Sequence, residues 1–339
     1  MEKVQEDNLL IRASACLWGG AVGDAMGKAT EGYSSAGIFE SYGQALEDFV
    51  EPIQPLSQFS WQRAEVTEDT RQTVCVAKAI VEEGKVDQLS IAKHLLNCDH
   101  KGIGTSSRLF HFMLIKDIGY VADKGSGNGA AMRIAPVGLV NSSSDLERLV
   151  EDVYKACIMT HGGKAGIAGA AAMAAAVAAA VEGWPGGYVM IHALKAAKLA
   201  ERLGHADNLT PVAQQIQVGI DLAIELSGEE LISKIGQEIG WGFKACEAVP
   251  AALVLATTQL SARDAILAAV NQGGDADAIA GMAGCLASAL NPYTLPKKWI
   301  EEVQTVNKLD MNALASKLSA LRPVHAKVHS ELRWMEIGG

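Results

Sequence analysis

A run of small apolar residues from 165 to 181 constrains the fold more than any other feature of this chain. It holds no charged residue and consists mainly of alanine and glycine. Alanine is the strongest helix former, and side chains this small let neighbouring helices approach closely. The run is slightly short for a bilayer and too weakly hydrophobic to favour lipid. We therefore interpret it as a buried helix of a soluble protein and expect no membrane partner.

Apolar residues recur at helical spacing through much of the remaining chain, between turns rich in Gly, Pro or Asn. Aromatic residues make up only 5%, and no sustained two-residue alternation suggests a strand. The sequence predicts an all-α protein, a compact stack of helices with no domain boundary within residues 1–339. The predicted helical segments are 74–81, 89–96, 146–157, 167–181, 190–203, 212–226, 249–260, 262–270 and 278–290.

Charge and cysteine usage exclude several classes of protein. The net charge is −10, and no cluster of Lys and Arg with interleaved aromatics occurs, so we expect no nucleic-acid partner. The six cysteines are spread singly without a C-x-x-C pair, which is typical of a reducing compartment. The N-terminal residues are acidic where a secretion signal would be basic. These features predict a cytoplasmic protein.

Thr67, Glu68 and Asp69 stand just before the helical segment at 74–81. Thr67 is the natural N-cap, and the two acids fall in the first turn, where negative charge complements the helix dipole. Capping alone explains this pattern. The alternative is that the same oxygens bind a metal ion, and a second acidic helix start favours that alternative.

The second acidic start follows two glycines. Gly273 and Gly274 precede Asp275 and Asp277, and an apolar helical segment begins at 278. The glycines remove side chains where a ligand would approach the backbone, so we assign them to substrate binding. The two aspartates diverge in a regular helical turn, whereas an irregular turn directs both toward one point.

A third acidic segment lies near the N-terminus. Glycines at 19, 23 and 27 recur every four residues around Asp24, and Glu31 follows. This spacing also fits a glycine face for close helix packing, which is the structural alternative to an acidic site.

Carboxylates and a hydroxyl, without paired His or Cys ligands, are the donors that Mg²⁺ or Mn²⁺ prefers. Two or three carboxylates from each of two distant segments can hold two ions, which activate a water molecule and bind a substrate oxygen. We therefore expect Asp69, Asp275 and Asp277 to form one cluster. The predicted metal ligands are Thr67, Glu68, Asp69, Asp275 and Asp277.

A glycine-rich segment at 125–129 lacks both the lysine of a P-loop and the spacing of a dinucleotide fingerprint. It is either a flexible loop or a set of backbone N–H groups for phosphate or ribose oxygens. Thr160 and His161 stand just before the alanine-rich helix. His161 is either a core histidine or a hydrogen-bond donor to a phosphate. Arg133, just after the glycine-rich segment, either pairs with an anion or bonds neighbouring carbonyls in the core.

Taken in order, these segments resemble the ADP-ribosylglycohydrolase family over almost the whole chain. That family includes dinitrogenase reductase-activating glycohydrolases, ADP-ribosylserine hydrolases and J1 crystallins. The resemblance implies a single-domain orthogonal helix stack with a dinuclear magnesium centre, which cleaves the glycosidic bond at C1 of an ADP-ribosyl group. The matching motifs are G-D-A-M-G followed by Glu31, T-E-D-T at 67–70, G-N-G-A-A-M-R-I-A-P at 127–136, T-H at 160–161, P-A-A-L at 250–253 and N-Q-G-G-D-A-D-A-I-A-G at 271–281.

The resemblance also implies roles for the acidic residues. The segments 67–69 and 275–277 match the family's metal-binding runs, and Glu31 matches a glutamate near the scissile bond. Asn128, Gly129, Met132 and Arg133 match the loop that holds ADP-ribose in the family. The implied substrate-binding residues are Ser126, Gly127, Asn128, Gly129, Met132, Arg133, His161, Gly273 and Gly274. The implied catalytic residues are Glu31, Glu68 and Asp69. Metal ions then hold the ribose hydroxyls, a carboxylate orients or deprotonates a water, and the aglycone leaves through an oxocarbenium-like state. The implied substrate is an ADP-ribosylated protein or a small ADP-ribose derivative.

Two departures from the family pattern affect the predicted metal ligands. Glu68 replaces an aspartate, and Ala278 replaces a threonine whose hydroxyl is a metal ligand in the family. Arg71 follows Glu68 by three residues on one helical face, so its guanidinium can reach the Glu68 carboxylate or the neighbouring acids, and the alternative is an ordinary surface ion pair. We therefore expect one of the two metal positions to be weak or empty. Two alternatives stay open: hydrolysis of a small N- or O-riboside, and a catalytically inactive, crystallin-like protein that binds ADP-ribose.

Overall fold

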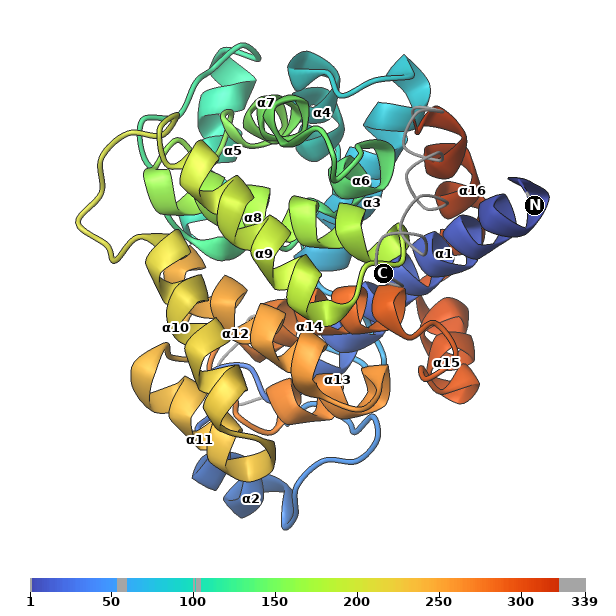
Figure 1. Cartoon of the computed structure of the whole chain (residues 1–339), viewed down its shortest axis with the longest axis vertical. Coiled ribbons are helices and arrows are strands. Elements are labelled where there is room, and N and C mark those ends of the chain that lie inside the picture. The colour runs from blue at the N-terminus through green and yellow to red at the C-terminus, as the bar shows by residue number, and fades with distance from the viewer. Residues whose placement is uncertain (1, 54–59, 100, 102–104, 323–339) are drawn as a thin grey trace, which may run out of the picture.

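The computed structural model describes residues 2–53, 60–99, 101 and 105–322 (Figure 1). Within these ranges all named elements are helices, which confirms the predicted all-α class. The helices are α1 (Glu2–Gly27), α2 (Ser35–Tyr42), α3 (Glu68–Glu83), α4 (Gln88–Leu96), α5 (Thr105–Lys116), the short 3-10 helix η1 (Asn128–Ala130), α6 (Ala135–Val140), α7 (Leu146–Cys157), α8 (Lys164–Val181), α9 (Gly186–Ala200), α10 (Val212–Glu225), α11 (Gly228–Glu238), α12 (Ala245–Thr258), α13 (Ala262–Val270), α14 (Ala276–Leu290), α15 (Lys297–Asn307) and α16 (Met311–Leu321).

The alanine-rich helix α8 lies in the middle of the stack. All its residues from 165 to 181 are buried, against α6, α7, α9, α12 and α14. By length and composition alone α8 would suffice to cross a membrane, but 94% of that stretch is buried inside the protein. Its small apolar side chains therefore serve helix packing, as the sequence predicts.

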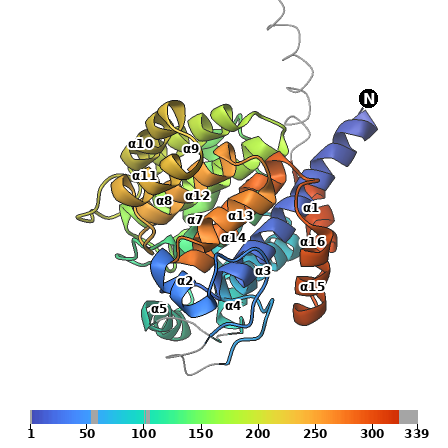
Figure 2. The same ribbon diagram turned by 90° about the horizontal axis from the view of Figure 1, so that it is seen from below.

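The closest helix pair joins the two ends of the chain. α1 and α14 form the most extensive helix contact of the fold and run side by side in Figures 1 and 2. Gly23 makes this approach possible, because a Cβ atom there would lie 2.0 Å from the Ala280 carbonyl oxygen. Gly27 lies equally close to the first turn of α14, where a Cβ would be 2.3 Å from the Ala276 oxygen. The glycine face is thus confirmed as a packing surface.

Loop backbones pair with one another at the start of α14. The Gly32 N–H donates to the Gly274 oxygen at 2.7 Å, and the Gly274 N–H donates to the Tyr33 oxygen at 2.8 Å. The Asp275 N–H donates to the Trp241 oxygen at 2.8 Å. Gly274 has φ +65°, and a Cβ there would lie 2.1 Å from the Trp241 oxygen, so both conformation and space require glycine.

Gly273 is constrained in the same way as its neighbour. Its φ is +71°, and a Cβ there would lie 2.1 Å from the Tyr33 oxygen. The two glycines therefore hold the loop at 31–34 against the start of α14. This structural role accounts for both glycines, and their assignment to substrate binding stays a prediction.

Helix boundaries differ from the predicted ones by a few residues. α12 begins at Ala245, before the predicted start at 249, so Pro250 lies inside the helix rather than in its first turn. The missing N–H of Pro250 removes one helical hydrogen bond from this turn. α9 ends at Ala200, before the predicted end at 203.

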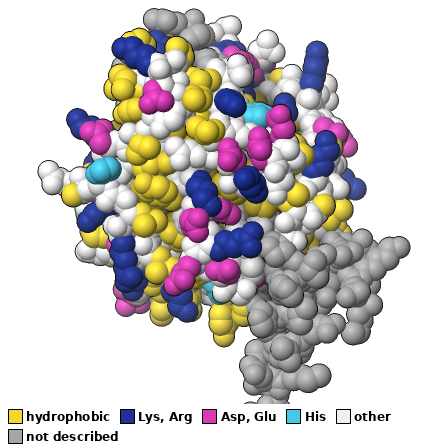
Figure 3. All heavy atoms as spheres, turned by 90° about the horizontal axis from the view of Figure 1, so that it is seen from above, with side chains coloured by type: hydrophobic (Ala, Val, Ile, Leu, Met, Phe, Trp, Pro, Cys, Tyr) yellow, Lys and Arg dark blue, Asp and Glu magenta, His cyan; other side chains and the backbone are white. Residues whose placement is uncertain are grey.

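The surface drawn in Figure 3 mixes the two signs of charge. Basic and acidic side chains alternate there with apolar ones, and neither sign forms a continuous field over this face.

Candidate functional site

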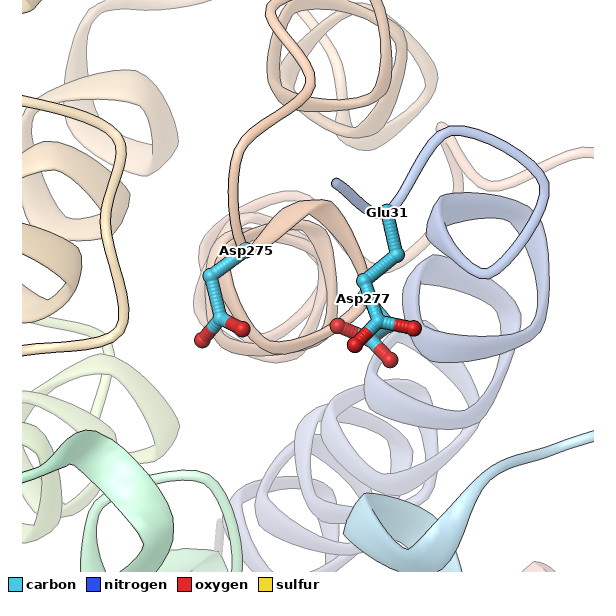
Figure 4. A group of neighbouring side chains, drawn as sticks. All are labelled: Glu31, Asp275 and Asp277. Carbon is cyan, nitrogen blue, oxygen red and sulfur yellow. The ribbon is translucent and has the colours of Figure 1, made fainter. Parts of the chain in front are cut away.

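Three carboxylates meet where the end of α1 reaches the start of α14. Glu31 comes from the turn after α1, Asp275 is the N-cap residue of α14, and Asp277 lies in its first turn. One oxygen of each lies within 4.8 Å of the others. Figure 4 shows all three pointing to the same side of the helix start. Glu31 is exposed, Asp275 half-buried and Asp277 buried, so the cluster opens to solvent at Glu31.

The start of α3 supplies further acids. Thr67 caps the helix as predicted, and its hydroxyl accepts a hydrogen bond from the Asp69 N–H at 3.2 Å. Asp69 is buried, and its Oδ2 has no hydrogen-bond partner. Burial, followed by the charge of Asp277, raises the pKa of Asp69 well above its ordinary value. Asp69 of α3 and Ala278 of α14 line the same small cavity, so the starts of these two helices face one another.

Asp24, on the glycine face of α1, was not among the predicted site residues. It is 1% exposed and accepts hydrogen bonds from the Thr67 N–H and the Thr70 N–H at 3.1 Å, and from the Thr70 hydroxyl at 2.5 Å. Burial raises its pKa even so. Asp24 thereby fixes the first turn of α3 against α1 and places Asp69. The available signal was a lone acid within an otherwise apolar glycine face.

We call these five acids the acidic centre: Glu31, Glu68, Asp69, Asp275 and Asp277. Their negative charges repel one another. Burial, then the charges of Glu31 and Asp275, raises the pKa of Asp277 well above its ordinary value. Burial likewise raises the pKa of Asp275 and of Glu68. A divalent cation relieves such repulsion. The oxygen-only donor set and the unpaired Oδ2 of Asp69 fit a hard ion such as Mg²⁺.

The cation beside these acids is a lysine rather than the expected arginine. Arg71 pairs with Glu65 at 3.1 Å and with Asp99 at 3.5 Å, so the prediction that it reaches the acidic centre is wrong. Lys28 instead forms an ion pair with Glu31, and its Nζ lies 3.9 Å from Asp277 Oδ2. Although burial favours the neutral amine, the Asp277 and Glu31 carboxylates raise the pKa of Lys28.

The glycine-rich loop braces the acidic centre from the other side. The Asn128 side chain donates to Asp275 Oδ2 at 2.5 Å, and its backbone N–H donates to the Phe243 oxygen at 2.9 Å. Gly127 forms an isolated bridge with Lys244. The first function visible for this loop is therefore to orient Asp275.

Arg133 and His161 lie in a buried polar layer behind that loop. Arg133 is 3% exposed and donates to Gln72 Oε1 at 2.7 Å and to Thr160 Oγ1 at 2.5 Å. His161 Nδ1 lies 2.8 Å from the same Thr160 hydroxyl. A Cβ at Gly129 would lie 3.0 Å from the His161 ring, so a larger residue there would have to displace the imidazole.

Met132 connects this layer to the acidic centre. It lines a buried cavity of about 20 Å³ together with Arg133 and His161, and a second cavity of the same volume together with Asp24 and Asp69. Each is large enough for one water molecule.

The backbone at the start of α8 is already hydrogen-bonded within the protein. The Ala165 N–H donates to Asp207 Oδ2 at 2.9 Å, and the Ser126 hydroxyl donates to the same oxygen at 2.5 Å. The Lys164 N–H donates to the His205 oxygen at 2.9 Å. The Asp207 carboxylate thus lies at the N-terminal end of α8, where the helix dipole favours negative charge. This is the position that we expected a phosphate group of the ligand to occupy.

The titration of His161 gives a prediction for stability. Burial, and secondarily the Arg133 charge, lowers the pKa of His161 to about 3. The unfolded chain therefore binds a proton that the folded chain does not, and stability falls as pH drops below the ordinary histidine pKa of about 6.5. From pH 7.5 to 5.5, wild type should lose about 1.4 kcal/mol more than His161→Gln in urea unfolding.

Both proteins keep the acidic centre, so its titration cancels in this comparison. The exposed His205 provides the control, and His205→Gln should follow the wild-type pH dependence. Equal pH dependence of wild type and His161→Gln would contradict a neutral, buried His161.

Comparison with known proteins agrees with this architecture. The ADP-ribosylglycohydrolase family model matches residues 5–327. The protein YegU of Escherichia coli (strain K12) is 27% identical over 328 residues, with 92% of this chain and 97% of that protein covered. ADP-ribosylhydrolase ARH3 of Mus musculus is 25% identical over 350 residues, with 89% and 90% covered.

A solved structure titled ADP-ribosylglycohydrolase-related protein complex has a TM-score of 0.71 and 22% identity, and the alignment covers 94% of this chain and all of that one. This likeness confirms the helical fold. Because the family model spans nearly the whole chain, the protein belongs to the ADP-ribosylglycohydrolase family.

Proposed function

We propose that this protein is a magnesium-dependent hydrolase that removes mono-ADP-ribose from a protein or small molecule in the cytoplasm, by cleaving the glycosidic bond at C1. The observation that carries the proposal is the triad of Glu31, Asp275 and Asp277, with one oxygen of each within 4.8 Å of the others. Family membership supports hydrolysis of an ADP-ribosyl group. Manganese is an alternative ion, because it accepts the same oxygen donors.

In this proposal each residue of the acidic centre has a role that follows from its position. Asp69, Asp275 and Asp277 would hold the ion, with Thr67 and Glu68 beside them. A bound divalent ion polarises substrate oxygens and lowers the pKa of an attached water. Glu31, the exposed member, orients a water molecule and accepts its proton, as a general base does.

The surrounding negative charge serves the bond-breaking step. Departure of the aglycone leaves positive charge on the ribose ring, and nearby carboxylates stabilise that charge. Asn128 keeps Asp275 in position through its hydrogen bond. The predicted contacts of the 126–133 segment, His161, Gly273 and Gly274 with ADP-ribose belong to this proposal.

The test is an incubation of the protein with mono-ADP-ribosylated protein, ADP-ribose derivatives and simple ribosides, with Mg²⁺ or with EDTA. We expect free ribosyl product only with the metal, and a loss of about a hundredfold or more in rate for Asp275→Asn, because the ion contributes several kcal/mol of transition-state stabilisation. Product formation that continues unchanged in EDTA would contradict the metal dependence. No product from any substrate would favour the inactive, ADP-ribose-binding alternative.

A second candidate substrate is a small N- or O-riboside without a diphosphate. The observation that favours it is the position of Asp207, which already accepts hydrogen bonds from Ala165 and Ser126 at the start of α8. A carboxylate there repels a diphosphate. Faster cleavage of simple ribosides than of ADP-ribosyl compounds would select this candidate.

A further inference from the structure

Lys28 lies beside the acidic centre, and the proposed mechanism does not use its charge. It directly follows α1, where the C-terminal end of the helix dipole favours a cation. Its side chain is only 15% exposed. A lysine this enclosed has few places to turn, so its ammonium is held where the structure shows it.

The ammonium makes two kinds of contact. It forms an ion pair with Glu31 and lies 3.9 Å from Asp277 Oδ2. It also lies over the Trp61 ring, 4.7 Å from the ring centroid. A cation over an aromatic face is attracted by the ring. Trp61 therefore helps to hold the ammonium beside the two carboxylates.

Glu31 and Asp277 are two of the three members of the carboxylate triad. A cation that neutralises both would compete with a divalent ion bound between them. We infer that the Lys28 ammonium permanently occupies one of the two cation positions of the acidic centre, so that this chain holds a single tightly bound divalent ion. The inference rests on the metal centre of the proposed function.

Repulsion makes the two occupants mutually exclusive. An ion held by Glu31 and Asp277 would share the two carboxylates that the Lys28 ammonium neutralises, in a poorly solvated place where like charges repel strongly. Asp69 Oδ2 has no hydrogen-bond partner, whereas Asp277 Oδ1 accepts a hydrogen bond from the Ala278 N–H at 2.9 Å. Asp69 and Asp275, with Asp277 beside them, would therefore hold the single ion.

The chain offers a matched control in Lys101. Its ammonium lies over the same Trp61 ring, 4.4 Å from the centroid, but pairs with Glu65 at 2.5 Å rather than with the acidic centre. Lys101→Met thus removes an equivalent charge from the same aromatic ring. Lys28→Met keeps the length of the side chain and removes only the charge at the acids.

The experiment measures Mn²⁺ binding to the metal-free full chain without substrate. Equilibrium dialysis gives the number of ions bound, and electron paramagnetic resonance reveals whether two ions are spin-coupled. Wild type, Lys101→Met and Lys28→Arg should bind one tight ion with an uncoupled signal. Lys28→Met should bind a second ion at least about tenfold more tightly than wild type does, with a coupled signal.

Two tight, coupled ions in wild type would overturn the inference and leave the metal centre intact. The inference also fails if Lys28→Met gains no second ion while Ala278→Thr does, because the missing hydroxyl would then be the cause. No tight ion in any folded variant would overturn both this inference and the proposed metal centre. If Lys28→Met does not fold, Lys28→Gln replaces it. The number of tight ions bound by wild type tests the inference in either case.

Discussion

Replacing Asp277 by asparagine is expected to abolish the stabilisation of this protein by Mg²⁺. Asp277 is buried at the meeting point of the α1 turn and the α14 start, among carboxylates that raise its pKa. An ion that binds only the folded state adds about 4 kcal/mol of stability at a thousandfold excess over its dissociation constant. Wild type should therefore melt several degrees higher with Mg²⁺ than with EDTA. Asp277→Asn should melt at the same temperature in both.

The same substitution should raise the stability of the metal-free protein at neutral pH. The asparagine removes one of several buried like charges, whose mutual repulsion the single Lys28 ammonium offsets only in part. Asp310→Asn is the matched control, because Asp310 caps α16 through the Ala313 N–H and asparagine caps equally well. A metal response that survives in Asp277→Asn would place the ion elsewhere.

The second large effect is expected at Gly23. A Cβ atom there would lie 2.0 Å from the Ala280 backbone oxygen, so Gly23→Ala must push α1 away from α14. Overpacking of this kind lowers the free energy of unfolding by about 3 kcal/mol or more, because the Ala280 backbone cannot move aside as a side chain can. The measurement is urea unfolding of the metal-free protein. Metal affinity should fall as well, because Glu31 follows α1 and Asp277 lies on α14.

Gly187 is the control for that substitution. It also lies in a helix, but a Cβ there meets nothing within 4 Å. Gly187→Ala should be neutral or stabilise the protein by about 0.5 kcal/mol, because alanine is the better helix former. Equal effects of the two substitutions would mean that α1 and α14 do not pack as closely as described.

Local patterns in the sequence predicted the helices and the cap of α3. The alanine content of α8, the N-cap at Thr67 and the four-residue glycine spacing of α1 each act over one or two turns, so they are visible without the fold. That Asp69 shares an ion with Asp275 and Asp277 stays a prediction from chemistry, because a hard ion needs more oxygens than one segment supplies. The three carboxylates whose oxygens lie within 4.8 Å of one another are those of Glu31, Asp275 and Asp277. The organisation as one domain and the roles of the individual site residues stay predictions.

The partner of each charged residue could not be predicted, because tertiary packing decides it. Arg71 satisfies the spacing rule for Glu68, yet the fold places Glu65 and Asp99 nearer to its guanidinium. Lys28 reaches Asp277 only because α14 lies against α1. One signal was available: Lys28 and Glu31 are three residues apart, which is a common spacing for a helical ion pair.

The pairing of α1 with α14 also determines when the protein can become functional during synthesis. A ribosome that has released only the first 270 residues has exposed α1 and Glu31 but neither Asp275 nor Asp277. Until α14 emerges, the glycine face of α1 lacks the helix on which it packs in the folded chain. The metal centre that we propose would therefore form only after residue 277 has been released, and α1 needs shielding from wrong partners for most of translation.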